Sequence, residues 1–95
     1  MKAKNLLKQR IPRTSHSFVD LVVWEVSEPL AGSVHNYKYR LAYVVNGICV
    51  LRYDNEAGKG DHKHIGNDEM VCTFTTPAKL ISDFWADVEL LEKML

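Results

Sequence analysis

The alternation of hydrophobic and polar side chains predicts several β-strands followed by one helix. The segment FVDLVVWEV (18–26) is rich in valine and aromatic residues, and both of its alternating sets of side chains are largely apolar, which predicts a strand partly covered on both faces. The segments YKYRLAYVV (37–45) and ICVLRYD (48–54) predict two further strands, and EMVCTF (69–74) predicts a shorter fourth one.

The dipeptide Asn46-Gly47 predicts that the second and third strands form a hairpin. Asn-Gly tolerates the positive φ of a type I′ turn, and only these two residues separate the strands. In the register that follows, Leu41 faces Arg52 and Arg40 faces Tyr53. The apolar halves of both strands then lie near the turn. Their polar halves form a polar platform at the opposite end, made of Lys38, Tyr39, Arg40, Arg52, Tyr53, Asp54 and Asn55.

The last segment, TTPAKLISDFWADVELLEKML (75–95), has the periodicity of an amphipathic helix. One of the two threonines before Pro77 is expected to cap it. Asp83 and Asp87 are expected to point away from its apolar stripe. That stripe consists of Leu80, Ile81, Phe84, Val88, Leu91 and Leu95. The predicted fold class is α+β: a small twisted antiparallel sheet of about four strands, built around the Asn-Gly hairpin, with the C-terminal helix packed on one face.

Length and composition fit one small domain. The chain has 95 residues, of which 46% are hydrophobic, and this suffices for a single core. Residues 1–17 are basic and polar and are expected to form an N-terminal arm, whereas residues 18–95 are expected to form a single α+β domain. No stretch approaches the ~20 apolar residues of a membrane span, so we expect a cytoplasmic protein. The formal net charge of zero neither requires nor excludes a nucleic-acid partner.

The segment RYDNEAGKGDHKHIGNDE (52–69) concentrates titratable side chains next to the polar platform. His62 and His64 are spaced so that both point to the same side of an extended segment, with Lys63 on the opposite side. Because histidine titrates near neutral pH, this pair suits acid–base catalysis. The side chains expected to carry catalysis are His62, His64, Arg52, Asp54 and Tyr53.

Glycines, cations and aromatic rings near this segment suit contact with RNA. Gly58 and Gly60 allow main-chain amides to approach a phosphate closely, and they are expected in a mobile loop beyond the platform. Tyr39 and Tyr53 are candidates for stacking on bases. His35 is expected to lie near the same loop. The predicted RNA- and phosphate-binding residues are Lys38, Arg40, Lys59, Lys63, Gly58 and Gly60.

Together these residues predict RNA strand cleavage without a metal ion. That reaction needs a base for the 2′-hydroxyl, an acid for the leaving oxygen and cations for the phosphoryl charge. We therefore expect a ribonuclease of the mRNA-interferase kind, with no cofactor and no metal ligands. Two alternatives stay open. One is a non-catalytic module that binds phosphate or nucleic acid, and the other is a metal-dependent nuclease or nucleotidyl-modifying enzyme that uses Asp54, Asp61, His62 and His64.

The motifs KYRL, VLRYDN, GKGDHKH and DFWADV follow one another along the chain. With them, residues 18–90 closely resemble the TumE-like toxins of type II toxin–antitoxin systems. The resemblance implies a small growth-inhibiting toxin with presumed ribonuclease activity and a cognate antitoxin that has a DNA-binding domain. The positions that match the family's motifs are Lys38, Arg40, Arg52, Tyr53, Asp54, Asn55, Gly58, Lys59, Gly60, Asp61, His62 and His64.

Partners are expected on the polar platform and along the sheet edges. RNA, free or on the ribosome, is the expected substrate, and no membrane is expected as a partner. An antitoxin would cover the platform or extend the sheet along an open edge, and the exposed edges of so small a sheet also suit a homodimer.

Overall fold

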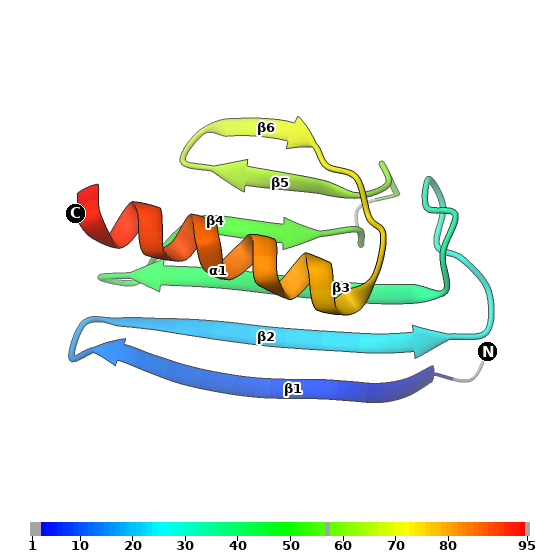
Figure 1. Ribbon diagram of the computed structural model, residues 1–95, viewed down its shortest axis with the longest axis horizontal. Coiled ribbons are helices and arrows are strands. Elements are labelled where there is room, and N and C mark those ends of the chain that lie inside the picture. The colour runs from blue at the N-terminus through cyan, green and yellow to red at the C-terminus, as the bar shows by residue number, and fades with distance from the viewer. Residues whose placement is uncertain (1–2, 57, 95) are drawn as a thin grey trace.

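Six antiparallel strands in chain order form one sheet, and a C-terminal helix crosses one of its faces (Figure 1). The computed structural model describes residues 3–56 and 58–94. The elements are β1 (Ala3–Thr14), β2 (Ser17–Val26), β3 (Tyr37–Val45), β4 (Ile48–Asp54), β5 (His62–Ile65), β6 (Asp68–Val71) and α1 (Pro77–Met94). The predicted α+β class is confirmed, with six strands in place of about four.

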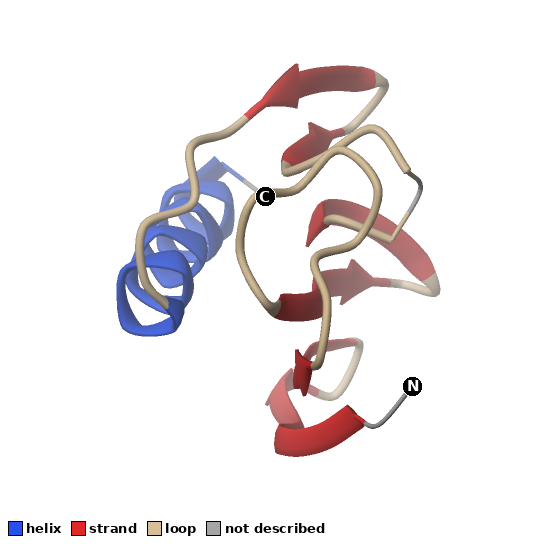
Figure 2. Cartoon of the chain, turned by 90° about the vertical axis from the view of Figure 1, so that its right-hand side faces the viewer, coloured by secondary structure: helices blue, strands red, loops and turns tan. Residues whose placement is uncertain are grey.

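Figure 2 shows α1 end-on beside one face of the sheet, and the hydrophobic core lies between the helix and that face. Fully burying one large apolar side chain stabilises the fold by about 1.5–3 kcal/mol, so the packing of α1 on this face is strongly favoured. Within the described chain, no second helix covers the opposite face, which we call the open face. The buried core residues are Val19, Leu21, Val23, Tyr39, Leu41, Tyr43, Leu51, Tyr53, Leu80, Phe84 and Val88.

The segment 3–14, expected to belong to a basic N-terminal arm, forms the edge strand β1. Leu7 and Ile11 pack against the core, while most other side chains of the strand are exposed. Arg13 joins β1 to α1 through two hydrogen bonds to Glu92, at 2.7 and 2.8 Å. The charged side chains that suggested an arm are of the kind that protect an exposed sheet edge from pairing with other chains.

The turn of the central hairpin forms as predicted, with φ of 52° at Asn46 and 77° at Gly47. The first two pairs beside the turn also match the predicted register. A bulge at Val50 then shifts the register by one residue, so that Tyr43 pairs with Leu51 instead of Val50. An extra residue in one strand moves every later side chain of that strand to the opposite face of the sheet from the one expected without the bulge.

Beyond the bulge, the predicted pairs Leu41–Arg52 and Arg40–Tyr53 are wrong. Leu41 lies opposite Tyr53, and Arg40 lies opposite Asp54. Tyr53 therefore enters the core with Leu41. Arg40, Arg52 and Asp54 are brought together on the open face, so the bulge assembles the polar end of the hairpin differently from the sequence-based register.

The segment expected to be a mobile loop, Gly58 to His64, contains the first residues of strand β5. β5 pairs with β4 and then, through a turn at Gly66 (φ 59°), with β6. The predicted strand at 69–74 is displaced, because β6 ends at Val71 and residues 72–76 lead into the helix. The short polar sequence HKHI has little of the apolar content by which a strand is recognised.

The helix α1 starts close to the predicted position. The Thr76 hydroxyl oxygen accepts a hydrogen bond from the Lys79 backbone N–H at 3.1 Å, which makes Thr76 the cap. Leu80, Phe84 and Val88 are buried, as the apolar stripe predicted, whereas Leu95 lies outside the described residues. The described residues form no helix that combines the length and the apolar character needed to cross a membrane.

Candidate active site on the open face of the sheet

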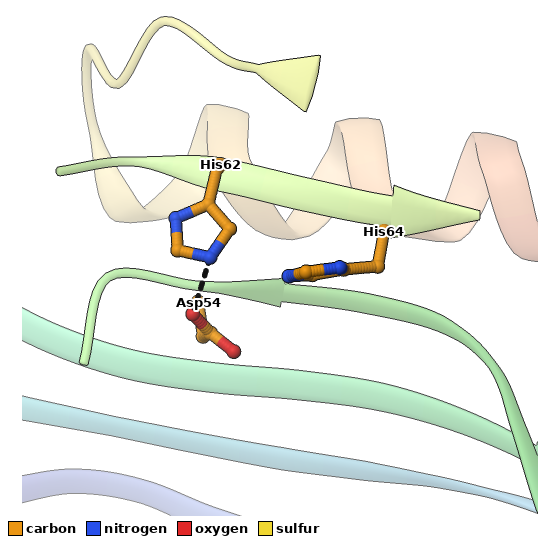
Figure 3. A group of neighbouring side chains, drawn as sticks. All are labelled: Asp54, His62 and His64. Atoms are coloured by element: carbon orange, nitrogen blue, oxygen red, sulfur yellow. Dashed lines mark ion pairs between the residues drawn. The ribbon is translucent and has the colours of Figure 1, made fainter. Parts of the chain in front are cut away.

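Asp54, His62 and His64 meet on the open face, where pairing of β4 with β5 brings them together (Figure 3). Asp54 lies opposite His62, and Arg52 lies opposite His64. His62 Nε2 is 3.1 Å from Asp54 Oδ1, and Arg52 Nε is 2.7 Å from Asp54 Oδ2. Asp54 is 6% and His62 is 3% exposed, so the centre of the cluster is buried. We call Asp54, His62 and His64 the carboxylate–imidazole cluster.

His62 is held by a contact at each ring nitrogen. Its Nδ1 lies 2.9 Å from the Gly60 carbonyl oxygen, and because that oxygen only accepts, Nδ1 carries the proton and donates. Nε2 is thereby directed at the Asp54 carboxylate. As a result, neither nitrogen of His62 faces solvent, and the side chain is a fixed part of the sheet face.

His64 is the more accessible imidazole of the pair. Its ring centroid lies 5.0 Å from that of His62, with the ring planes at 73°. His64 Nδ1 lies 3.7 Å from Glu69 Oε2, and Lys59 Nζ donates to both Glu69 oxygens, at 3.2 and 3.4 Å. The hydrogen bond from Lys59 lowers the pKa of Glu69, so that carboxylate stays ionised beside the ring.

Three buried polar atoms in the cluster lack a hydrogen-bond partner in the described chain: Asp54 Oδ1, His64 Nε2 and Arg52 Nε. Asp54 Oδ1 has His62 Nε2 at 3.1 Å, and Arg52 Nε has Asp54 Oδ2 at 2.7 Å, but neither contact has the geometry of a hydrogen bond. A buried polar group without a partner costs about 1–3 kcal/mol. Such groups are rare in folded proteins, and three in one place make this cluster the candidate site.

Cations border the cluster on the same face. Arg40 lies opposite Asp54 in the register and is exposed. Within the described residues, no carboxylate lies within ion-pair distance of Arg40, whereas Lys38 has Glu56 at 3.7 Å. Arg40 is therefore a cation on the open face that is available to an incoming anion.

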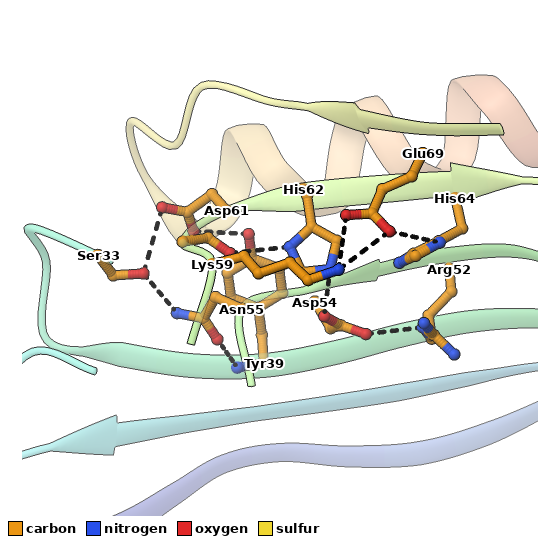
Figure 4. A network of polar contacts seen from close by, with 11 residues as sticks. Ser33, Tyr39, Arg52, Asp54, Asn55, Lys59, Asp61, His62, His64 and Glu69 are labelled. Atoms are coloured by element: carbon orange, nitrogen blue, oxygen red, sulfur yellow. Dashed lines mark hydrogen bonds and ion pairs between the residues drawn. The ribbon is translucent and has the colours of Figure 1, made fainter. Parts of the chain in front are cut away.

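A second polar network lies at the same end of the sheet, toward α1 (Figure 4). The Tyr39 hydroxyl donates to Asp61 at 2.7 Å. His35 Nδ1 accepts from the Tyr37 backbone N–H, so His35 Nε2–H donates to Asp61 at 2.8 Å. Burial, together with the bond to Asp61, raises the pKa of Tyr39 well above its ordinary value. Fully buried Asn55 continues the ladder beyond β4, since its side chain bonds the backbone of Tyr37 and Tyr39.

This second network changes the roles expected for its members. The predicted proximity of His35 to the loop is confirmed by its bond to Asp61. Asp61 is separated from the carboxylate–imidazole cluster, because its carboxylate bonds His35 and the core residue Tyr39, whereas its neighbour His62 lies beside Asp54 on the open face. Tyr39 is 0% exposed and has no surface on which a base could stack.

Two glycines hold the adjoining loops together. A Cβ on Gly32 would lie 2.4 Å from the Gly60 nitrogen, and both residues have positive φ, at 84° and 85°. Glycine is therefore required at position 60 by the close contact between these two backbone segments. Gly58 also has positive φ, at 76°, but nothing lies within 4 Å of its Cβ position.

Tyr53 and Lys63 lie on the side of α1, away from the cluster. The Tyr53 hydroxyl and Lys63 Nζ both donate to Asp87, the latter at 3.0 Å. The prediction that Asp87 points away from the core face is therefore wrong. Burial, then the hydrogen bond to Asp87, raises the pKa of Tyr53 far above its ordinary value. The structure does not bring Tyr53 to the other predicted catalytic residues, nor Lys63 to the predicted phosphate-binding residue Arg40 on the open face.

Sequence reasoning also missed two features near the cluster. Glu69 lies opposite His64 in the β5–β6 pair, which only the correct strand bounds would have indicated. A cavity of about 550 Å³ has both apolar and charged lining residues: Ala3, Trp24, Val26, Glu28, Pro29, Leu30, Lys38 and Glu56. Lys38 lies two residues before Arg40 on β3, so these two side chains lie on the same face of the sheet.

The fold and the site define a small α+β protein whose open sheet face carries a buried carboxylate and two imidazoles bordered by cations. The family model described as Toxin TumE matches residues 3–92, and the chain belongs to this toxin family. The match includes β1, which lies outside the resemblance drawn from motifs over residues 18–90. No curated protein and no solved structure matches the chain.

Proposed function

We propose that this toxin inhibits growth by cleaving RNA at the carboxylate–imidazole cluster. The observation that carries the proposal is the position of the cluster: Asp54, His62 and His64, with unpaired buried atoms, lie beside Arg40 and Arg52 on the open face. Guanidinium groups match the oxygens of a phosphodiester. A scissile phosphate held by the two arginines would therefore lie over the cluster.

The reaction that fits is transfer of the phosphoryl group to the neighbouring ribose hydroxyl. The 2′-oxygen bonds to phosphorus while the bond to the 5′-oxygen breaks, which leaves a 2′,3′-cyclic phosphate and a 5′-hydroxyl. One group takes the 2′ proton, and another supplies a proton to the 5′-oxygen. His64 is suited to one of these tasks because its Nε2 has no partner in the described chain. His62 is poorly placed for the other, since both of its nitrogens are engaged.

The substrate class is supported by the cavity at Trp24. Aromatic side chains bind unstacked bases through their faces, and Trp24 lines this cavity. This cavity replaces the two buried tyrosines as the candidate place for a base. A single-stranded RNA crossing the open face would then contact Trp24 with a base and Arg40 with a phosphate.

The proposal is tested by incubating the purified toxin with single-stranded RNA and with translating ribosomes, each with and without EDTA, and mapping the RNA ends. Cleavage with cyclic phosphate ends is expected from the wild type and from His16→Ala, because His16 is an exposed residue in the β1–β2 turn. His64→Ala is expected to lose cleavage. Intact RNA under all four conditions, even if bound, would reject RNA cleavage and leave a binding module.

We further infer a cytoplasmic protein neutralised by an antitoxin with a DNA-binding domain. Toxin-family membership supports the partner. Edge strand β6 is exposed over its whole length and presents Val71, which is 86% exposed, so it suits extension by a partner strand. Co-expression of the neighbouring reading frame should restore growth and co-purify with the toxin, and failure of both would reject this partner. A homodimer through β1 or β6 would be seen in the mass of the toxin alone.

A further inference from the structure

We propose that Asp54, His62 and His64 bind a divalent metal ion of the zinc type, and that this ion is part of the toxin's site. One ligand atom from each residue lies within 4.8 Å of the other two. Ligands bound at about 2.1 Å to one tetrahedral ion lie about 3.4 Å apart. A modest rotation of the side chains therefore closes the three atoms around one ion.

The orientation of the ligand atoms supports this assignment. His62 donates from Nδ1 to the Gly60 carbonyl, which leaves Nε2 as its ligand atom. His64 Nδ1 faces Glu69, which leaves Nε2. Histidines that bind metal commonly use one nitrogen for the ion and donate from the other to a carbonyl or a carboxylate. His62 has this arrangement, and His64 Nδ1 lies 3.7 Å from Glu69 Oε2, which is an ion-pair distance.

Burial supplies a second, independent indication. Asp54 is 94% buried, since 6% of it is exposed, and its Oδ1 has no hydrogen-bond donor in the described chain. His64 Nε2 is likewise buried and unpaired. These are two of the three proposed ligand atoms, and an ion between them would satisfy both at once.

The donor set indicates the kind of metal. Two imidazoles and one carboxylate are the ligands of many catalytic zinc sites, whereas calcium and magnesium prefer sites made wholly of oxygen. The set differs from the one considered from sequence, because Asp61 is engaged by His35 and Tyr39 on the other side of the sheet. Because both of its nitrogens have protein neighbours, His62 is poorly placed to act as a free acid or base. Metal binding gives this side chain a role as a ligand.

The ion would add to the positive charge of the open face. One carboxylate and a dication leave a net charge of +1, with Arg40 and Arg52 beside it. Three protein ligands leave a coordination position for water or a phosphate oxygen. This catalytic part rests on the proposed RNA cleavage, whereas metal binding itself does not.

Metal binding is tested on the untagged full-length chain after EDTA treatment, by calorimetric titration with Zn²⁺ and by the visible spectrum with Co²⁺. One saturable site per chain is expected, with spectral bands typical of tetrahedral Co²⁺. Asp54→Asn, His62→Asn and His64→Ala are each expected to weaken binding by at least about tenfold. Asn at 62 can still donate to Gly60, so this variant removes the ligand atom and keeps the structural bond.

His16→Ala and Cys49→Ser are the matched controls, because both residues are exposed and Cys49 is a free thiol that can bind zinc by itself. Both are expected to keep wild-type affinity, and Zn²⁺ should raise the melting temperature of the wild type but not of Asp54→Asn. No saturable binding, or binding lost only in Cys49→Ser, would overturn the site. Metal binding without RNA cleavage would reject only the proposed function, and undiminished cleavage in EDTA by metal-free protein would reject the ion's part in it.

Discussion

Asp54 Oδ1 and His62 Nε2 lie 3.1 Å apart on the face of the sheet that α1 leaves open. The contact exists because the bulge at Val50 turns Asp54 to that face and because β5 pairs with β4 in register. Both side chains are buried, yet no hydrogen bond satisfies Asp54 Oδ1 within the described chain. A buried carboxylate in this state is costly for stability and useful for binding a ligand.

The two histidines should differ in their contribution to stability. His62→Ala leaves the Gly60 carbonyl without its donor and Asp54 Oδ1 without its neighbour, so it should lower the free energy of unfolding by about 1–3 kcal/mol. His64→Ala removes an atom that has no partner and should cost less than about 1 kcal/mol. Urea denaturation of metal-free protein measures both. A larger loss in His64→Ala would contradict this account of His62.

The crossing of the two loops should make Gly60 far less replaceable than Gly58. Gly60→Ala places a Cβ 2.6 Å from the Gly32 carbonyl oxygen and should cost about 3 kcal/mol or more. Gly58→Ala meets nothing within 4 Å and should cost only about 1 kcal/mol for its positive φ. The same denaturation experiment compares them. Equal losses would show that the loops do not cross as described.

Binding of RNA should depend on salt through the open face alone. Arg40→Ala removes one phosphate contact, which should flatten the plot of log affinity against log salt by about 0.7 for a single strand. Lys63→Ala removes an equal charge on the side of α1, where Lys63 pairs with Asp87, and should leave the slope unchanged. Fluorescence anisotropy at several salt concentrations gives both slopes. A flatter slope in the Lys63 variant alone would contradict this account, because it would place the RNA on the side of α1.

The buried tyrosines should make the fold sensitive to alkali. Burial and the bond to Asp87 raise the pKa of Tyr53 in the folded state. Above about pH 10 only the unfolded chain releases this proton, so stability that is complete below that pH is lost as pH rises. Tyr53→Phe should lower the free energy of unfolding by about 0.5–1.5 kcal/mol at pH 8. Between pH 9 and 11, the stability of this variant should fall less steeply than that of the wild type. Parallel pH profiles for wild type and variant would contradict this role.

The class of the fold follows from patterns that act locally. The Asn46-Gly47 turn, the valine-rich strand at 18–26 and the apolar stripe of the helix each predict their element because one short segment contains the whole signal. β1 and β5 escape such prediction. Their side chains are largely polar, and they are strands because of the neighbours with which they pair.

The sequence predicted several residues of the site better than it predicted which of them lie together. Spacing correctly places His62 and His64 on one side, since β5 is extended. A one-residue bulge is not visible in the residues of β4, and it alone decides that Asp54 joins the histidines while Tyr53 enters the core. The separation of Asp61 from Asp54 likewise depends on contacts with His35 and Tyr39, which are distant in sequence.

The central claim is that the carboxylate–imidazole cluster cleaves RNA, and Asp54→Asn tests it most directly because the two side chains have nearly the same shape. The rate of RNA cleavage by this variant should fall by at least about 10²-fold relative to wild type, while its circular dichroism spectrum and the activity of the Lys63→Ala control stay at wild-type levels. Cleavage by Asp54→Asn at the wild-type rate would contradict the claim.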